Sequence, residues 1–155
     1  MNTTKVFERI LSESGDLSLE QMYRDRGDKE VSSTPWVESS DKSSILTRTL
    51  SVEFQLPSNP IVKKCPATRT FKMIEKTDTK MLLRVTTKCR DVNNSADFNI
   101  EEEWLVASLP TSSNSCALRI SAVVVFEKFT MMKTQIKTHH DKESAAFWLL
   151  FKDTI

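Results

Sequence analysis

Few residues in this sequence can carry catalytic or metal-binding chemistry, and they do not form a familiar motif. The two histidines, His139 and His140, are adjacent, so on a helix they point about 100° apart and cannot hold one metal ion together. We expect them to lie on a helix surface or to line a groove. The three cysteines, Cys65, Cys89 and Cys116, lie in separate segments without a histidine at ligand spacing, which indicates ordinary buried or half-buried thiols.

Three consecutive glutamates include one carboxylate that can meet a ligand. In a strand, Glu101 and Glu103 share one face, whereas Glu102 points to the other face with Ile100 and Trp104. A solvated strand face explains the outer two. Glu102 is therefore the candidate to contact a ligand, or to act as an acid or base if the domain hosts a reaction.

The sequence holds no nucleotide-binding or hydrolase motif. It has only two glycines, Gly15 and Gly27, so neither a P-loop nor the G-x-G-x-x-G and G-x-S-x-G patterns can occur. We therefore expect a protein that is not an enzyme and that needs no cofactor and no metal.

Length and composition bear on the number of domains, the redox compartment and the possibility of a membrane span. A chain of 155 residues is expected to form a single domain, residues 1–155, with a real core. An odd number of cysteines argues against a disulfide framework and favours the reducing cytosol. Apolar runs such as residues 122–126 are too short to span a bilayer.

The charge pattern does not favour a nucleic-acid partner. The formal net charge is +1, and the basic residues Arg84, Lys88 and Arg90 share one strand face without aromatic neighbours for base stacking. The solvent-facing side of a sheet explains these three residues better than a nucleic-acid surface does.

The pattern of apolar residues predicts helices, then strands, then one long helix. Ser18 and Gln21 fit a capping box with Leu17 and Met22 as its hydrophobic staple, so a helix is expected to start at Ser18. From Leu46 to Leu56 the apolar residues alternate with polar ones, which is typical of a strand with one wet face.

Further strands are expected near residues 67–76, 80–91, 98–108 and 116–129, joined by short turns into an antiparallel meander. After Thr130 the period becomes helical, with Met132, Ile136, His139 or His140, Ala146 and Leu150 on one stripe. A curved sheet around such a helix can leave a cavity for an apolar ligand.

Several short segments, in the right order, resemble the VASt domain, the StART-like lipid-transfer module of the Aster and Lam proteins. The similarity runs from about Val6 to Phe151. The segment "STPW" resembles the first strand of that family, and "RTLSVEFQL" resembles its arginine-led second strand. The segment "NPIVKK" resembles the Asn-Pro loop of the family. Its Asp-Val-Pro-Tyr motif with a later Phe is matched by "DVNNSADF", and its last strand and corner by "LRISAVVVFEKFTMMKTQI".

The resemblance implies an α+β helix-grip fold, in which a curved antiparallel sheet surrounds a long C-terminal helix, with short N-terminal helices. It also implies a non-enzymatic carrier that holds one sterol in an internal cavity and moves it between membranes at contact sites. Parent proteins in the family are usually anchored at the endoplasmic reticulum and carry a GRAM domain. Neither feature is in this sequence, so we expect an excised domain on the cytosolic side.

Candidate ligand contacts follow from this interpretation. The resemblance makes residues 58–65 a lid, in which Pro60, Ile61 and Val62 shield the cavity, and Ile61, Val62, Lys63 and Lys64 meet an anionic membrane. The apolar wall is expected to include Phe54, Phe98, Trp104, Phe126 and Trp148. A sterol hydroxyl needs a polar partner, for which Glu102, Gln55 and Ser121 are candidates.

Two alternatives remain open at this point. Asn93 and Asn94 replace the Pro-Tyr of the family's most distinctive motif, and bulky aromatics are numerous. Both features favour a protein-interaction domain on the same fold with a collapsed cavity. An enzyme that uses Glu102 is the weaker alternative.

Overall fold

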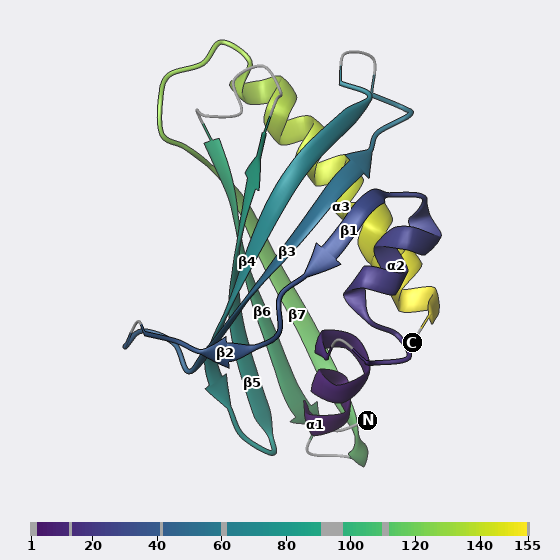
Figure 1. Cartoon of the computed structure of the whole chain (residues 1–155), viewed down its shortest axis with the longest axis vertical. Helices are drawn as coiled ribbons and strands as arrows, with labels where there is room; N and C mark the ends of the chain where they lie inside the picture. Colours follow the sequence, from purple (N-terminus) through teal and green to yellow (C-terminus); the bar gives the residue numbers. More distant parts are fainter. Residues whose placement is uncertain are drawn as a thin grey trace.

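A long C-terminal helix lies across one face of a twisted antiparallel sheet, and short N-terminal helices cover the rest of that face (Figure 1). The structure, a computed structural model, describes residues 3–12, 14–40, 42–59, 62–90, 98–109 and 112–154. The α+β architecture predicted from the sequence is confirmed, and it is consistent with a StART-like helix-grip fold.

The elements follow the order helices, strands, helix. They are α1 (Thr3–Val6), the π turn η1 (Phe7–Leu11), α2 (Leu19–Arg26), β1 (Lys29–Ser33), β2 (Val37–Glu38), β3 (Leu46–Gln55), β4 (Lys64–Lys76), β5 (Lys80–Cys89), β6 (Phe98–Leu109), β7 (Ser112–Phe126) and α3 (Lys133–Thr154). The strand order in the sheet is β1-β3-β4-β5-β6-β7, and β2 pairs with β3.

Alternating burial shows which face of each long strand points inward. Along β4 the inward residues include Ala67, Phe71 and Met73, and along β5 they include Leu83 and Val85. These side chains meet those of η1 and α2 in one continuous core. Because neighbouring strands run antiparallel, the last residues of β3, β5 and β7 and the first residues of β4 and β6 all lie at one end of the sheet, which we call the open end (Figure 1).

Local signals in the sequence fix the position of α2. The Ser18 side chain caps the helix by accepting a hydrogen bond from the Gln21 backbone N–H at 3.3 Å, as predicted. The Gln21 side chain bonds to Asp25 instead, so only half of the capping box forms. Gly27 ends the helix at a φ of +96°, a left-handed conformation that glycine adopts without strain.

Arg48 ties these N-terminal elements to the sheet. It points inward from β3 although it is charged, and it forms a buried ion pair with Glu20 of α2. It also donates to the Leu11 carbonyl at 2.6 Å and to the Thr34 carbonyl at 3.1 Å. The arginine of the "RTLSVEFQL" segment therefore holds together parts of the chain that are distant in sequence.

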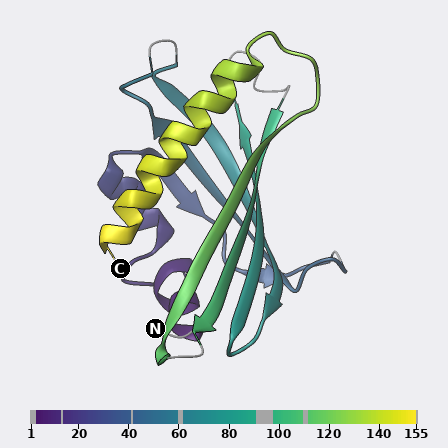
Figure 2. The ribbon, with the colours of Figure 1, turned by 180° about the vertical axis from the view of Figure 1, so that it is seen from behind.

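The second half of α3 packs tightly on the core, whereas the first half does not. Phe147 stacks on Tyr23 of α2 with ring centroids 5.1 Å apart, and Trp148 meets Trp104 of β6 edge-on at 5.0 Å. Figure 2 shows α3 crossing the sheet obliquely from the open end toward these contacts.

One part of the helical prediction was wrong. Ala146, which was expected on the inner stripe, is exposed, and the inner face carries Glu143 and Phe147 instead. The reason is that residues 145–149 are apolar nearly all around the helix, so their periodicity does not distinguish one face. None of the helices in the described ranges combines the length and apolar character needed for a membrane span.

Candidate functional site

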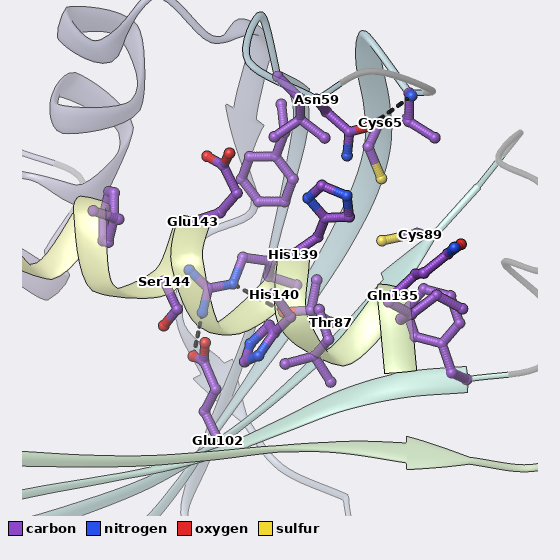
Figure 3. A pocket seen from close by; sticks show the side chains of 18 of the residues that line it. Asn59, Cys65, Thr87, Cys89, Glu102, Gln135, His139, His140, Glu143 and Ser144 are labelled. Carbon is purple, nitrogen blue, oxygen red and sulfur yellow. Dashed lines mark hydrogen bonds and ion pairs between the residues drawn. The ribbon is translucent and has the colours of Figure 1, made fainter. Parts of the chain in front are cut away.

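A pocket lies between the first half of α3 and the inner face of the sheet, near the open end (Figure 3). Its volume is about 330 Å³, which lies at the lower end of the usual range for ligand sites, ~300–1,000 Å³. The wall is mainly apolar, and its apolar members include Phe54, Leu56, Val62, Phe98, Ile100 and Met132.

A buried ion pair forms the floor of this pocket. Arg69 of β4 and Glu102 of β6 both point inward, with β5 between the two strands. Their side chains are 5% and 8% exposed. Glu102 Oε2 accepts hydrogen bonds from Arg69 and from the Trp104 indole N–H, the latter at 3.0 Å. Arg69 also donates to the Tyr23 hydroxyl and, at 3.1 Å, to the Thr87 hydroxyl.

These contacts leave bonding capacity that a ligand can use. An arginine side chain has five N–H donors, and among the described residues Arg69 donates to three partners. The second oxygen of Glu102, Oε1, receives no hydrogen bond from any described residue. A hydroxyl group above the floor can therefore donate to Glu102 and accept from Arg69 at once.

Burial and the neighbouring charges together set the protonation states of Arg69 and Tyr23. Burial alone lowers the pKa of Arg69, but Glu102 and Tyr23 outweigh burial, so the pKa of this guanidinium is raised and it stays charged. Burial raises the pKa of Tyr23, against the opposing effect of Arg69, so its phenol stays protonated.

Helix α3 contributes a wall that is more polar than the sheet side. Its apolar members are Ile136, Phe147 and Trp148, and polar side chains lie between and beside them. The polar members are Gln135, His139, His140, Glu143 and Ser144. The two histidines thus line a groove on a helix, one of the two positions expected from the sequence. His140 Nδ1 lies 3.2 Å from the Asp141 carboxylate.

The loop between β3 and β4 borders the pocket at the open end. Its two sides are joined by a hydrogen bond from the Leu56 N–H to the Lys63 carbonyl at 2.9 Å. Inside this closure, the buried Asn59 side chain accepts from the Val62 N–H at 2.9 Å. The Asn59 side chain therefore ties down the backbone of Val62, and both residues line the pocket.

The residues predicted from the sequence have the following positions. Five of the wall and floor candidates line the pocket, namely Phe54, Val62, Phe98, Glu102 and Trp148. Trp104 lies in the core beneath the pocket, and Phe126 packs on Phe98 with centroids 6.0 Å apart; neither is a lining residue. Pro60 and Ile61 lie outside the described residues.

The other predicted polar and membrane residues lie around the pocket. Gln55 bonds to Glu53 of its own strand, and Ser121 is exposed on β7 opposite Glu103, so neither lines the pocket. Lys63 and Lys64 are exposed at the open end, where Lys64 lies 3.2 Å from Glu53. Contact with lipid remains a prediction for each of these residues.

Sequence analysis missed Arg69, Tyr23 and Thr87. A signal for Arg69 exists, because it alternates with Ala67 and Phe71 and so falls on the apolar side of β4. The same signal exists for Thr87, which alternates with Val85 and Cys89 on the apolar side of β5, whereas Tyr23 carries no comparable signal. Within the part of the chain that the structure describes, no group of three or more histidine, cysteine or acidic residues can hold a metal ion.

A comparison with protein families identifies the chain. A family model described as the VAD1 Analog of StAR-related lipid transfer domain, VASt, matches residues 1–142. The chain belongs to the VASt family. A search of curated proteins found no match. Membership in a lipid-transfer family suggests that this VASt domain binds a lipid.

The buried floor yields a prediction about stability. Changing Glu102 to Gln leaves the charge of Arg69 buried without its counterion, so we expect a loss of about 3–5 kcal/mol in the free energy of unfolding, measured with urea. The double variant Arg69→Met/Glu102→Gln removes both charges and is expected to recover much of that loss.

The matched control is the pair Arg84 of β5 and Glu103 of β6, which lie opposite each other on the outer face of the sheet. These side chains are exposed and 3.9 Å apart, so Glu103→Gln is expected to cost less than about 1 kcal/mol. Equal losses for Glu102→Gln and Glu103→Gln would contradict the assignment of the inner pair as the buried floor.

Proposed function

We propose that this VASt domain is a non-enzymatic carrier that binds one sterol in the pocket and moves it between membranes. The observation that carries the proposal is the combination of an apolar wall on the sheet side with a buried polar floor. Leu56, Phe98 and Ile100 offer the wall, and Arg69 with Glu102 offers the floor. A sterol has matching chemistry, since it is apolar along its length and carries one hydroxyl.

The hydroxyl is the part of a sterol that needs a specific partner. Burying this hydroxyl without a hydrogen bond costs roughly 1–3 kcal/mol of binding free energy. We place it on the floor, where it donates to Glu102 Oε1 and accepts from an unused N–H of Arg69. The rings and tail then extend along the apolar wall toward the open end, with Val62 beside them.

The energetics of transfer explain why no covalent chemistry is required. Burying on the order of 400 Å² of apolar surface gains roughly 10 kcal/mol relative to water. A bilayer offers a similar gain, so uptake and release are nearly balanced. The domain then acts by lowering the barrier to exchange, which requires the open end to touch the membrane.

The open end has features that suit an anionic membrane surface. The loop from β7 to α3 carries Phe129 and Met131, each 92% exposed, the highest values among the exposed large hydrophobics. Exposed basic residues stand at the same end of the sheet, where an anionic leaflet attracts each with about 1 kcal/mol. They are Lys63, Lys64, Lys88, Arg90, Lys128 and Lys133.

We therefore extend the membrane contact beyond the lid. Val62, Lys63 and Lys64 approach the bilayer from the β3 to β4 loop, and Phe129 and Met131 insert from the β7 to α3 loop. Met132 in this second loop is half-buried and lines the pocket. The family resemblance further suggests a parent protein at the cytosolic face of the endoplasmic reticulum, anchored there and carrying a GRAM domain, which acts at membrane contact sites.

Sterol binding is tested by titration with dehydroergosterol delivered from cyclodextrin, with energy transfer from tryptophan as the readout. We expect saturation at one sterol per domain. Ser144→Phe places a ring inside the pocket and should weaken binding at least tenfold, whereas Ala145→Phe, on the exposed next position of α3, should not.

Both variants are checked for an intact fold by circular dichroism. Absence of saturable binding by the unmodified domain would contradict the carrier proposal and favour the protein-interaction alternative. Equal binding by the Ser144 and Ala145 variants would place the sterol elsewhere.

Membrane contact is tested with vesicles that contain phosphatidylserine. Phe129→Asp/Met131→Asp should lower vesicle binding and slow sterol transfer between vesicles at least tenfold, because two charges replace the inserting side chains. Sterol uptake from cyclodextrin should be unchanged. The control Ile45→Asp alters a side chain that is 52% exposed at the other end of the sheet, and equal slowing by the control would contradict insertion by this loop.

A further inference from the structure

Two cysteines stand side by side where the pocket meets the open end. Cys65 is near the start of β4 and Cys89 is the last residue of β5. Ala67 pairs with Cys89 across the two strands, so Cys65 is the diagonal neighbour of Cys89 on the same inward face. Both side chains line the pocket, and Figure 3 shows their sulfur atoms pointing toward one another.

The two thiols differ chemically because of their surroundings. The Cys65 S–H donates to the Pro66 carbonyl at 3.8 Å. The neighbouring Cys65 thiol lowers the pKa of Cys89 although burial opposes the change. The influence of Cys89, together with burial, raises the pKa of Cys65. Burial raises the pKa of Cys116 on β7. Cys89 is thus the more reactive nucleophile of the pair, since the thiolate is the reacting form.

We propose that Cys65 and Cys89 form a redox-reactive dithiol, which a peroxide converts to a disulfide that joins β4 to β5 at the pocket. The Cys89 thiolate attacks one peroxide oxygen, the O–O bond breaks, and the second oxygen leaves as an alcohol or as water after taking up a proton. Cys89 is then a sulfenic acid. The Cys65 sulfur attacks the Cys89 sulfur, the S–O bond breaks, and water leaves with the Cys65 proton.

Closing this bond changes the positions of the start of β4 and the end of β5. Diagonal neighbours in a sheet lie about 7–8 Å apart, which is at the upper limit for a disulfide, so oxidation draws the ends of β4 and β5 together. Little resists the movement, because Pro66 lacks an N–H and the pair Pro66 and Arg90 has one ladder hydrogen bond, 2.7 Å long. A bond closed under this constraint is readily reduced, so the modification is reversible.

The functional consequence concerns access to the pocket. Cys65 directly follows the loop that contains Asn59 and Val62, and both of those residues line the pocket. Drawing the start of β4 toward β5 therefore shifts the base of that loop. Formation of the disulfide does not require any lipid, so this inference goes beyond the proposed carrier function and can be tested apart from it.

The test oxidises the purified chain with hydrogen peroxide and follows its intact mass and its reaction with an alkylating reagent. We expect the loss of two hydrogen atoms within one molecule, reversal by dithiothreitol, and a peptide cross-link between Cys65 and Cys89. Cys116→Ser should behave like the unmodified chain. Cys65→Ser and Cys89→Ser should form no intramolecular disulfide.

The pH dependence adds a second readout that a buried, inert pair would not show. Oxidation of Cys89 should reach half its maximal rate at a lower pH than alkylation of an ordinary cysteine, and Cys65→Ala should move that midpoint upward by removing the neighbouring thiol. Peroxide that leaves both thiols free, or that oxidises Cys116 first, would overturn the proposal. So would a rate profile that Cys65→Ala does not change.

Discussion

The buried ion pair between Arg69 and Glu102 constrains much of this structure. Two charges on the inner face of a sheet lose their hydration, and the loss is offset only if further hydrogen bonds complete the pair. Tyr23 from α2, Thr87 from β5 and Trp104 from β6 supply those bonds. The pair therefore fixes where α2 must dock, and it keeps the centre of the inner face polar within an otherwise apolar surface.

Helix α3 is held at one end, and the pocket exists because of this asymmetry. The contacts of Phe147 with Tyr23 and of Trp148 with Trp104 close the space under the second half of the helix. The first half has no aromatic side chains of its own to fill the space beneath it, and its polar residues face the pocket instead. The same aromatic residues that suggested a collapsed core thus fill one half of the groove and leave the other half open.

Much of the fold was predictable, because alternation and helical period are local properties. The strands from Leu46 onward, the long terminal helix and the cap at Ser18 all follow from neighbouring residues. The floor was harder, since Arg69 and Glu102 are 33 positions apart and the sequence does not say which strands pair. Only Glu102 was singled out. The inner face of α3 was misplaced at Ala146 because apolar residues surround the helix there.

The proposed selectivity of the pocket for a sterol is tested most directly by offering the domain a mixture of lipids. The purified chain is incubated with vesicles of cholesterol, phosphatidylcholine and phosphatidylserine, separated from them, and weighed intact by native mass spectrometry. We expect one cholesterol per chain from the unmodified domain, and a much lower occupancy for Arg69→Met/Glu102→Gln, which removes the polar floor. Recovery of no lipid, or of lipids in the proportions of the vesicles, would contradict a sterol site on that floor.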